Sequence, residues 1–223
     1  MIDHQQKERL LKVVLCGDGA SGKTSLCLRF AHESFNADYH QTLGLDFFTR
    51  RVILPGEIGV TLQVWDVGGQ SIASSMISKY ISGSDAIMIV YDITNKTSFE
   101  GAREWTESIK KMIKQSDSLP ALALVGNKTD LEAKRQVKME AHNRYVVDQE
   151  MTSMYTSART GDSVTLLFKQ MAAQVMKIPM AKSELDKEVV PIIAEATPAS
   201  QDTPKRGSSR VAGQNNTTVC TIM

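Results

Sequence analysis

The amino-acid sequence predicts a three-layer α/β fold, in which a six-stranded, mostly parallel sheet with one antiparallel strand is flanked by about five helices. Apolar runs of strand length alternate along the chain with longer segments of helical periodicity. Most of these runs are apolar at nearly every position, as expected for parallel strands that helices cover on both faces. Only a short turn at Pro55-Gly56 separates the second and third runs, which predicts an antiparallel hairpin.

The individual strands and helices follow from these patterns in chain order. The runs that predict strands cover residues 10–17, 46–54, 60–67, 85–93, 121–128 and 154–158. The segments that predict helices cover residues 24–32, 72–81, 98–114, 138–149 and 164–176. We expect the third helix to open with a capping box formed by Thr97 and Glu100.

Composition divides the chain into a short N-terminal extension (residues 1–9), one domain (10–178) and a tail (179–223). The tail holds four of the six prolines and no aromatic residue. Such a segment buries too little apolar area to offset the entropy lost on ordering. We therefore expect a flexible tail, in which residues 181–190 have the pattern of a short helix.

Charge and cysteine content exclude several function classes. The 26 basic and 25 acidic side chains give a net charge of +1, so no basic field favours nucleic acid. The apolar run at 86–91 is far shorter than the roughly 20 residues that a membrane span needs. The first residues lack a secretory signal and a Gly at position 2, so we expect a cytosolic start. The spacing of the cysteines (Cys16, Cys27, Cys220) and histidines predicts no disulfide framework or transition-metal centre.

A phosphate-binding loop is the strongest motif. Residues 17–24, GDGASGKT, fit G-x-x-x-x-G-K-S/T and lie between a predicted strand and a predicted helix. Backbone N–H groups at such a helix N-terminus bind phosphate, Lys23 reaches the β- and γ-phosphates, and the Thr24 hydroxyl binds Mg²⁺. The alternative is an ordinary glycine-rich turn. The candidate phosphate-binding residues are Gly19, Ala20, Ser21, Gly22, Lys23, Thr24 and Ser25.

A second motif, Asn127-Lys128-Thr129-Asp130, follows the fifth predicted strand and so lies at the same sheet edge as the phosphate loop. A carboxylate there accepts hydrogen bonds from the N1–H and the exocyclic amino group of guanine. Adenine lacks both donors and would leave Asp130 unpaired. The alternative is a helix-capping turn. The order and context of the motifs favour guanine recognition by Asp130.

Together with three further segments, these motifs resemble the small GTPases of the Ras superfamily over about residues 10–177. The segments are QTLGLDFF (41–48), WDVGGQ (65–70) and TSAR (156–159). The stretches LGLDFF and IVYDITNKTSFE resemble the Rab branch, and the combination of motifs resembles its divergent Rab twenty-eight subgroup. The resemblance implies a P-loop G domain that binds GTP or GDP with Mg²⁺ and hydrolyses GTP.

The resemblance also implies roles for individual residues. Asp66 would reach Mg²⁺ through water, and Thr42 would close onto Mg²⁺ and the γ-phosphate. The Gly69 N–H would contact the γ-phosphate, and Gln70 would position the attacking water while Lys23 stabilises developing charge. No motif residue is placed as an arginine finger, so slow turnover and a separate activating protein are expected.

At the base end, the resemblance places Phe35 beside the guanine and Tyr39 over the phosphates. The loop residues Ser157 and Ala158 would border the guanine carbonyl. The stems of Lys128 and Arg159 would lie along base and ribose. The plainer alternative is that Phe35 and Tyr39 are packing aromatics and Thr42 a surface loop residue.

The sequence departs from the Rab pattern in two places. Val67-Gly68 replaces the usual Thr-Ala, which adds backbone freedom beside Gln70 and raises the alternative of a GTP-locked interaction module with little hydrolysis. Residues 71–80 lack the usual Glu-Arg-aromatic run, so we expect atypical exchange factors and effectors at segments 36–48 and 66–82. A P-loop ATPase or small-molecule kinase is a third alternative, against which Asp130 argues.

The chain ends Cys220-Thr221-Ile222-Met223, a C-a-a-X pattern that predicts prenylation of Cys220 by a prenyltransferase, with Met favouring farnesyl. The alternative is a chance cysteine near the terminus. A single prenyl chain gives reversible attachment, so we expect a monomer that cycles between the cytosol and the cytoplasmic face of a membrane. By resemblance, that membrane is the plasma membrane, an endosome or the ciliary base, and the role is vesicle or membrane-protein transport.

Overall fold

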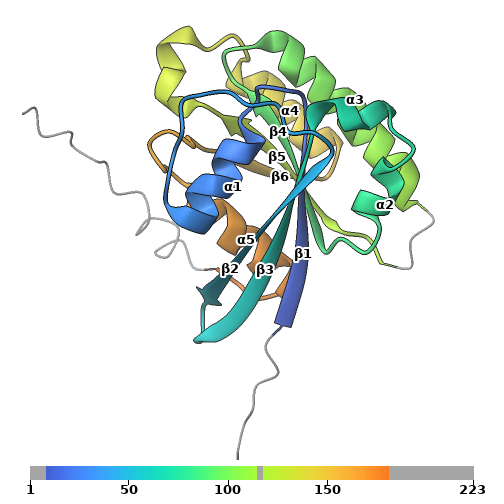
Figure 1. Ribbon diagram of the computed structural model, residues 1–223, viewed down its shortest axis with the longest axis vertical. Helices are drawn as coiled ribbons and strands as arrows, with labels where there is room; N and C mark the ends of the chain where they lie inside the picture. Colours follow the sequence, from blue (N-terminus) through green and yellow to red (C-terminus); the bar gives the residue numbers. More distant parts are fainter. Residues whose placement is uncertain (1–8, 115–117, 181–223) are drawn as a thin grey trace, which may run out of the picture. The chain divides into compact units, whose positions relative to one another are not determined.

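The computed structural model describes residues 9–114 and 118–180, which form a six-stranded sheet with helices on both faces (Figure 1). The spatial order of the strands is β2-β3-β1-β4-β5-β6. Their bounds are β1 Arg9–Cys16, β2 Leu45–Leu54, β3 Ile58–Val67, β4 Ala86–Asp92, β5 Ala121–Asn127 and β6 Thr152–Tyr155. The predicted fold class is confirmed, whereas the expectations for residues 181–190 and Cys220 lie outside the described residues.

The expected hairpin is present, since only the β2–β3 pair is antiparallel among the strands described. Its register runs from Leu45 opposite Val67 to Leu54 opposite Ile58. The turn extends one residue beyond Pro55-Gly56, because Gly56 and Glu57 both adopt left-handed backbone conformations (φ 77° and 59°). This long hairpin leads the chain from the loop after the first helix back toward the centre of the sheet.

Two apolar cores lie on opposite faces of the sheet. Helices α1 (Lys23–His32) and α5 (Val164–Met176) contribute to one core, where the rings of Phe30 and Phe168 stack with centroids 3.9 Å apart. Helices α2 (Ile77–Ile81), α3 (Lys96–Ile113) and α4 (Met139–Asp148) contribute to the other, around fully buried Trp105. β4 is buried at all of its positions, as expected for a central strand covered on both faces.

The second core contains a buried polar chain that links α4 to β4 and β6. His142 on α4 is completely buried. Its Nδ1 lies 2.9 Å from the Tyr91 hydroxyl and its Nε2 lies 2.8 Å from Ser153 Oγ. Burial, reinforced by the charge of Arg135, lowers the pKa of His142 from 6.5 to about 4. The imidazole is therefore neutral at physiological pH, with both ring nitrogens partnered.

The prediction of one helix over residues 72–81 is wrong for the first half of that segment. The chain instead forms a 3-10 turn, Gly69–Ala73, followed by the five-residue helix α2. Serine hydroxyls compete for backbone groups here, because Ser74 Oγ accepts from Met76 N at 3.1 Å and Ser78 Oγ donates to the Ser75 carbonyl at 3.4 Å. Buried apolar contacts begin only at Ile77, so continuous helix starts there.

The capping box expected at Thr97 and Glu100 is also wrong. The N-cap of α3 is Asn95, whose Oδ1 accepts from the backbone N–H groups of Thr97 (2.9 Å) and Ser98 (3.3 Å). The short Asn side chain satisfies these orphan donors one residue before the helix begins. The sixth strand is shifted as well, from the predicted 154–158 to Thr152–Tyr155, so the TSAR segment lies wholly in the loop after it.

Candidate nucleotide site

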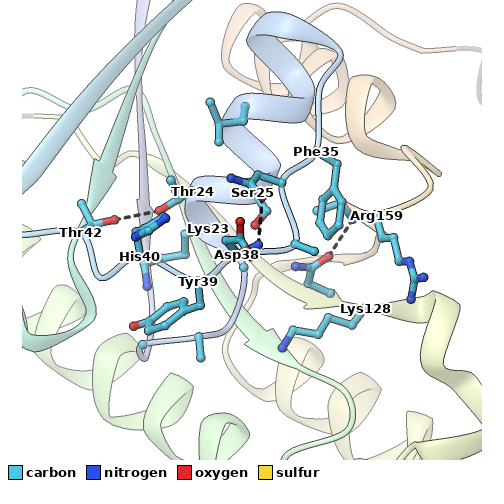
Figure 2. Close-up of a pocket in the computed structure, with 18 of the residues that line it drawn as sticks. Lys23, Thr24, Ser25, Phe35, Asp38, Tyr39, His40, Thr42, Lys128 and Arg159 are labelled. Carbon is cyan, nitrogen blue, oxygen red and sulfur yellow. Dashed lines mark hydrogen bonds between the residues drawn. The ribbon is translucent and has the colours of Figure 1, made fainter. Parts of the chain in front are cut away.

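A cavity of about 790 Å³ opens at the carboxyl ends of β1 and β5, the sheet edge to which the sequence motifs were assigned. Its size is in the range typical of small-molecule sites. Figure 2 shows Lys23, Thr24 and Thr42 on one side and Phe35, Lys128 and Arg159 on another. The lining residues are Gly19, Ala20, Gly22, Lys23, Thr24, Ser25, Leu28, Phe35 to Thr42, Gly69, Gln70, Asn127, Lys128, Asp130, Leu131, Ala158 and Arg159.

The phosphate loop curls tightly between β1 and α1. Gly17 and Gly22 have left-handed backbones (φ 129° and 91°). A Cβ on Gly17 would lie 2.2 Å from the Val90 carbonyl oxygen, so only glycine fits against β4 there. Ser21 is completely buried and donates to the Asp18 carbonyl at 2.9 Å. These contacts shape a loop whose later residues open directly into the cavity.

Lys23, the first residue of α1, is only 5% exposed. Its Nζ donates to the carbonyl oxygens of Gly17 (2.7 Å) and Asp18 (2.8 Å), so the cation lies against the phosphate loop. Burial lowers the pKa of Lys23, and the negative charge of Asp66 opposes this shift. The positive charge of this ammonium, at the wall of the cavity, attracts an anion.

Three side-chain oxygens from different elements converge beside Lys23. Thr24 Oγ1 lies 2.8 Å from Thr42 Oγ1 and donates to Asp66 Oδ2 at 2.5 Å. Thr42 Oγ1 lies 3.3 Å from the same carboxylate oxygen. Burial raises the pKa of Asp66, while the Thr24 hydrogen bond and the charge of Lys23 lower it. The other carboxylate oxygen, Asp66 Oδ1, is buried without a hydrogen-bond partner.

This oxygen cluster fits a magnesium ion. Mg²⁺ prefers oxygen ligands and usually keeps several waters, binding through one or two carboxylates together with substrate phosphates. The unpaired Asp66 Oδ1 supplies a buried acceptor for such a shell, and the two threonine hydroxyls face the cavity side. Within residues 9–114 and 118–180, no group of three or more His, Cys, Asp and Glu side chains forms a metal cage.

Asn127, the last residue of β5, bonds to two separate loops. Its Nδ2 donates to the Ser21 carbonyl at 2.9 Å, and its Oδ1 accepts from Ala158 N at 3.1 Å and Thr156 Oγ1 at 3.4 Å. A Cβ on Gly22 would lie 2.3 Å from Asn127 Nδ2. This side chain therefore ties the phosphate loop to the loop after β6.

The opposite end of the cavity carries the polar groups expected to read the base. Asp130 Oδ1 accepts from Ser157 Oγ at 2.6 Å, and Asp130 Oδ2 lies 4.0 Å from Arg159 Nη1. Lys128 Nζ pairs with Asp92 Oδ2 at 2.7 Å, which holds the lysine stem along the cavity wall. The Asp130 carboxylate is thus held in a fixed orientation by residues from a second loop.

Phe35, just before residues 36–48 (the first switch segment), and Tyr39 within that segment do not pack into a core. Phe35 is 37% exposed and Tyr39 is 64% exposed, and both line the cavity. A Cβ on Gly19 would lie 3.4 Å from the Tyr39 hydroxyl, so this ring covers the phosphate loop (Figure 2). Their positions favour the role implied by the family resemblance over the packing alternative.

The first switch segment and residues 66–82, the second switch segment, also touch each other and the phosphate loop. Gly68 N donates to the Gly44 carbonyl at 2.9 Å, and a Cβ on Gly68 would lie 2.4 Å from the Thr42 carbonyl oxygen. A Cβ on Gly69 would lie 2.3 Å from Gly19 N. The glycine pair therefore lets the second switch segment approach both neighbours closely, and the exposed side chain of Gln70 lines the cavity next to it.

Three predicted site residues support the cavity from behind its lining, and the cavity includes others that the motifs do not name. The residues behind the lining are Ser21, Asp66 and Ser157, all completely buried. Unpredicted lining residues are Leu28, Leu131 and residues 36–38 and 40–41. Their positions in the sequence could have indicated most of these residues, because Leu131 follows Asp130 directly and residues 36–41 lie between Phe35 and Thr42. For Leu28, the sequence gives no indication beyond its place on the expected helix.

Comparison with known proteins agrees with this site. The sequence profile of the Ras family matches residues 12–177 of this chain. The chain belongs to the Ras family. It is 44% identical over 221 residues to the Ras-related protein Rab-28 of Caenorhabditis elegans, which covers 99% of this chain and 89% of that relative. It is also 38% identical over 169 residues to the Ras-related protein Rab-13 of Rattus norvegicus, covering 76% of this chain and 81% of the relative.

Membership of the Ras family and likeness to two Rab proteins establish the general activity. This Ras-family chain is a Rab-type small GTPase, an enzyme that hydrolyses GTP and takes part in membrane trafficking. Rab proteins bind guanine nucleotide, regulators and effectors, and they associate with membranes. Among the described helices of this chain, none combines the length and apolar character that a membrane crossing requires.

Proposed function

We propose that this chain is a molecular switch that holds GTP or GDP with Mg²⁺ in the cavity and hydrolyses GTP slowly while a prenyl group at Cys220 attaches it to a membrane. The observation that carries the proposal is the convergence of three chemically distinct groups on one cavity. These are the Lys23 ammonium, the oxygens of Thr24, Thr42 and Asp66, and the Asp130 carboxylate. A guanine nucleotide needs all three.

Phosphate binding would rest on the loop at the start of α1. The backbone N–H groups of residues 19–25 surround phosphate, and Lys23 exchanges its carbonyl partners for phosphate oxygens. Guanine would lie between Phe35 and the Ala158 loop, with its N1–H and amino group donating to Asp130. Adenine would leave this carboxylate unpaired, so guanine is preferred.

Magnesium would be held by Thr24 and Thr42 directly and by Asp66 through water. When bound, Mg²⁺ neutralises charge on the phosphates. The residues of this chain hold the carboxylate and hydroxyls in place and keep the carboxylate ionised. Burial at the carboxyl end of β3 keeps the Asp66 carboxylate close to both hydroxyls, and the Lys23 charge favours its ionised form.

Hydrolysis would require a water aligned with the γ-phosphate by Gln70, with Lys23 and the loop amides stabilising developing charge. Among the described residues that line the cavity, the sole arginine is Arg159, which lies beside Asp130 at the base end. Since none of the described lining residues brings an arginine to the phosphate end, we expect slow intrinsic turnover and an activating protein that supplies the missing cation.

The switch segments would carry the state of the nucleotide to partners. Exchange factors, activating proteins and effectors bind through residues 36–48 and 66–82, where Leu43 (84%), Phe47 (53%) and Met76 (40%) are strongly exposed. Loss of the γ-phosphate releases Thr42 and Gly69, so these apolar side chains move apart. A partner that reads them together then dissociates.

Membrane attachment would come from the C-terminus. In this proposal residues 1–9 are an extension, residues 10–178 are the G domain, and residues 179–223 are the hypervariable tail that a prenyltransferase modifies at Cys220. A single prenyl chain lets a monomer cycle between the cytosol and a plasma, endosomal or ciliary-base membrane.

A second candidate function is a GTP-locked interaction module with little hydrolysis. The close approach of Gly68 to the Thr42 carbonyl favours it, because this contact stabilises a closed arrangement of the two switch segments. A rigid closed state would hold partners for as long as GTP remains bound.

Competition of GTP, GDP and ATP for wild-type protein and Asp130→Ala tests both candidates, followed by single-turnover hydrolysis of the bound GTP. We expect guanine preference in wild type only, with slow hydrolysis that Gln70→Leu abolishes. Binding of ATP as tight as that of GTP would refute the guanine site. GTP that persists in wild type, even with candidate activating proteins, would favour the locked module.

A further inference from the structure

Arg29 lies in the last turn of α1 and belongs to none of the nucleotide motifs. All three nitrogens of its half-buried guanidinium donate to backbone carbonyls. Nε donates to Ala158 O at 3.0 Å, Nη2 to Arg159 O at 2.7 Å and Nη1 to Glu33 O at 2.8 Å. Two of these acceptors are about 130 residues away in the sequence.

The three carbonyls belong to two segments that lead into or line the cavity. Glu33 caps α1 in a left-handed conformation (φ 55°) and leads, two residues later, to Phe35. Ala158 and Arg159 line the cavity from the loop after β6, and Figure 2 shows the Arg159 side chain next to Phe35. Arg29 thus joins the start of the first switch segment to the loop after β6.

The loop after β6 is held from both sides. On the far side, Ser157 bonds to Asp130 and Ala158 N bonds to Asn127. On the near side, Gly161 has a left-handed backbone (φ 87°), and a Cβ there would be in ordinary contact, 3.5 Å from Arg29 Cδ. The loop therefore packs along the aliphatic stem of Arg29 as well as against its charged end.

We propose that Arg29 is a positioning residue for nucleotide retention: it fixes the distance between the Phe35 wall and the Ala158–Arg159 wall, between which guanine is held. The inference rests on the proposed function, because it assumes that guanine lies between these walls. Hydrogen bonds from a charged donor are among the stronger ones in proteins. Without the guanidinium, three carbonyls lose a shared partner and the walls separate.

Arg29→Met keeps the stem but removes the charged donors. We expect it to release GDP about 10- to 100-fold faster, since losing charge-assisted bonds weakens the walls but leaves phosphate contacts intact. GTP should be released faster by the same factor, because both nucleotides share the base. Hydrolysis of GTP that is already bound should stay within about twofold of wild type, because Lys23, Thr42 and Gln70 lie elsewhere.

Arg50→Met is a matched control. Arg50 also bonds to the end of α1, through the Phe30 carbonyl and an ion pair with Glu33 Oε1 at 2.9 Å, but it has no contact with the loop after β6 among the described interactions. Arg50→Met removes a guanidinium from the same helix end, but Arg50 does not connect the two walls. Arg29→Lys keeps the charge and reaches fewer carbonyls, so it should give an intermediate release rate.

The test loads full-length wild type, Arg29→Met, Arg29→Lys and Arg50→Met with fluorescent GDP and measures release into excess unlabelled GDP with Mg²⁺. Faster release from Arg29→Met, partial recovery in Arg29→Lys and no change in Arg50→Met support the proposal. Equal release from wild type and Arg29→Met, or equal acceleration in Arg50→Met, overturns it while leaving the nucleotide site in place. A wild-type protein that retains no GDP overturns the proposed function and, with it, this inference.

Discussion

Replacing Gly68 with alanine places one methyl group where the first switch segment passes. The new Cβ would lie 2.4 Å from the Thr42 carbonyl oxygen and 3.4 Å from the Gly44 carbonyl oxygen. The backbone of Gly68 (φ −57°, ψ 136°) suits any residue, so the clash alone decides the outcome.

The size of the effect follows from two losses. Overpacking of this kind costs about 1 to 3 kcal/mol, and the Gly68 N–H bond to Gly44, 2.9 Å long, contributes about 1 kcal/mol. Together, about 2 to 4 kcal/mol disfavours the closed arrangement, which corresponds to a shift of about thirtyfold to a thousandfold in its population. The Thr42 hydroxyl moves with its backbone and leaves Thr24 and Asp66.

The assay compares the affinities of a non-hydrolysable GTP analogue and GDP, together with single-turnover hydrolysis. Gly68→Ala should lose affinity for the GTP analogue relative to GDP and hydrolyse more slowly, because only the triphosphate uses the closed arrangement. Gly83→Ala is the control, since a Cβ there would meet nothing within 4 Å, although its left-handed backbone (φ 68°) costs some stability. An unchanged affinity ratio in Gly68→Ala would refute the reasoning.

Two further predictions concern pH and the membrane. Because the pKa of His142 is about 4 in the fold and 6.5 is its ordinary value, the unfolded chain binds more protons between these values, so stability is complete above about pH 6.5 and falls as the pH drops. At pH 4.5 the loss of unfolding free energy should reach about 2 to 3 kcal/mol. Urea unfolding at pH 7 and pH 4.5 should show a smaller loss for His142→Gln than for wild type. An equal loss in both proteins would show that His142 is not the source of the pH dependence. Cys220→Ser should move the protein from membranes to the cytosolic fraction of cells, and continued membrane association would require another anchor.

Local motifs predicted most of the residues that line the candidate cavity, because each motif consists of consecutive residues. The phosphate loop and Asp130 could be placed once a strand was expected before each, and the hairpin followed from Pro55-Gly56. Contacts between distant segments could not be read in this way. The three carbonyls bonded by Arg29 are an example, since the sequence shows a basic residue on a helix and gives no sign of acceptors in the loop after β6.

Helix ends were predicted less well, for a different physical reason. The pattern of Thr97 and Glu100 satisfies the rule for a capping box, but Asn95 accepts from the Thr97 N–H that the Glu100 side chain would have bonded. The second switch segment has the apolar spacing of a helix, yet its serines bond to nearby backbone and leave only Ile77–Ile81 helical. In both cases several local hydrogen-bonding solutions have similar energies, and tertiary packing selects one.

The two ends of the cavity are made at different times as the chain is synthesised. The phosphate loop is complete by residue 25, whereas Asp130 and the Ala158–Arg159 wall lie more than 100 residues later. A nascent chain that has emerged from the ribosome only as far as β5 has a phosphate-binding turn without a base-binding wall. Tight binding of nucleotide is therefore possible only after the loop following β6 has emerged. Nucleotide binding thus reports that nearly the whole domain has been synthesised.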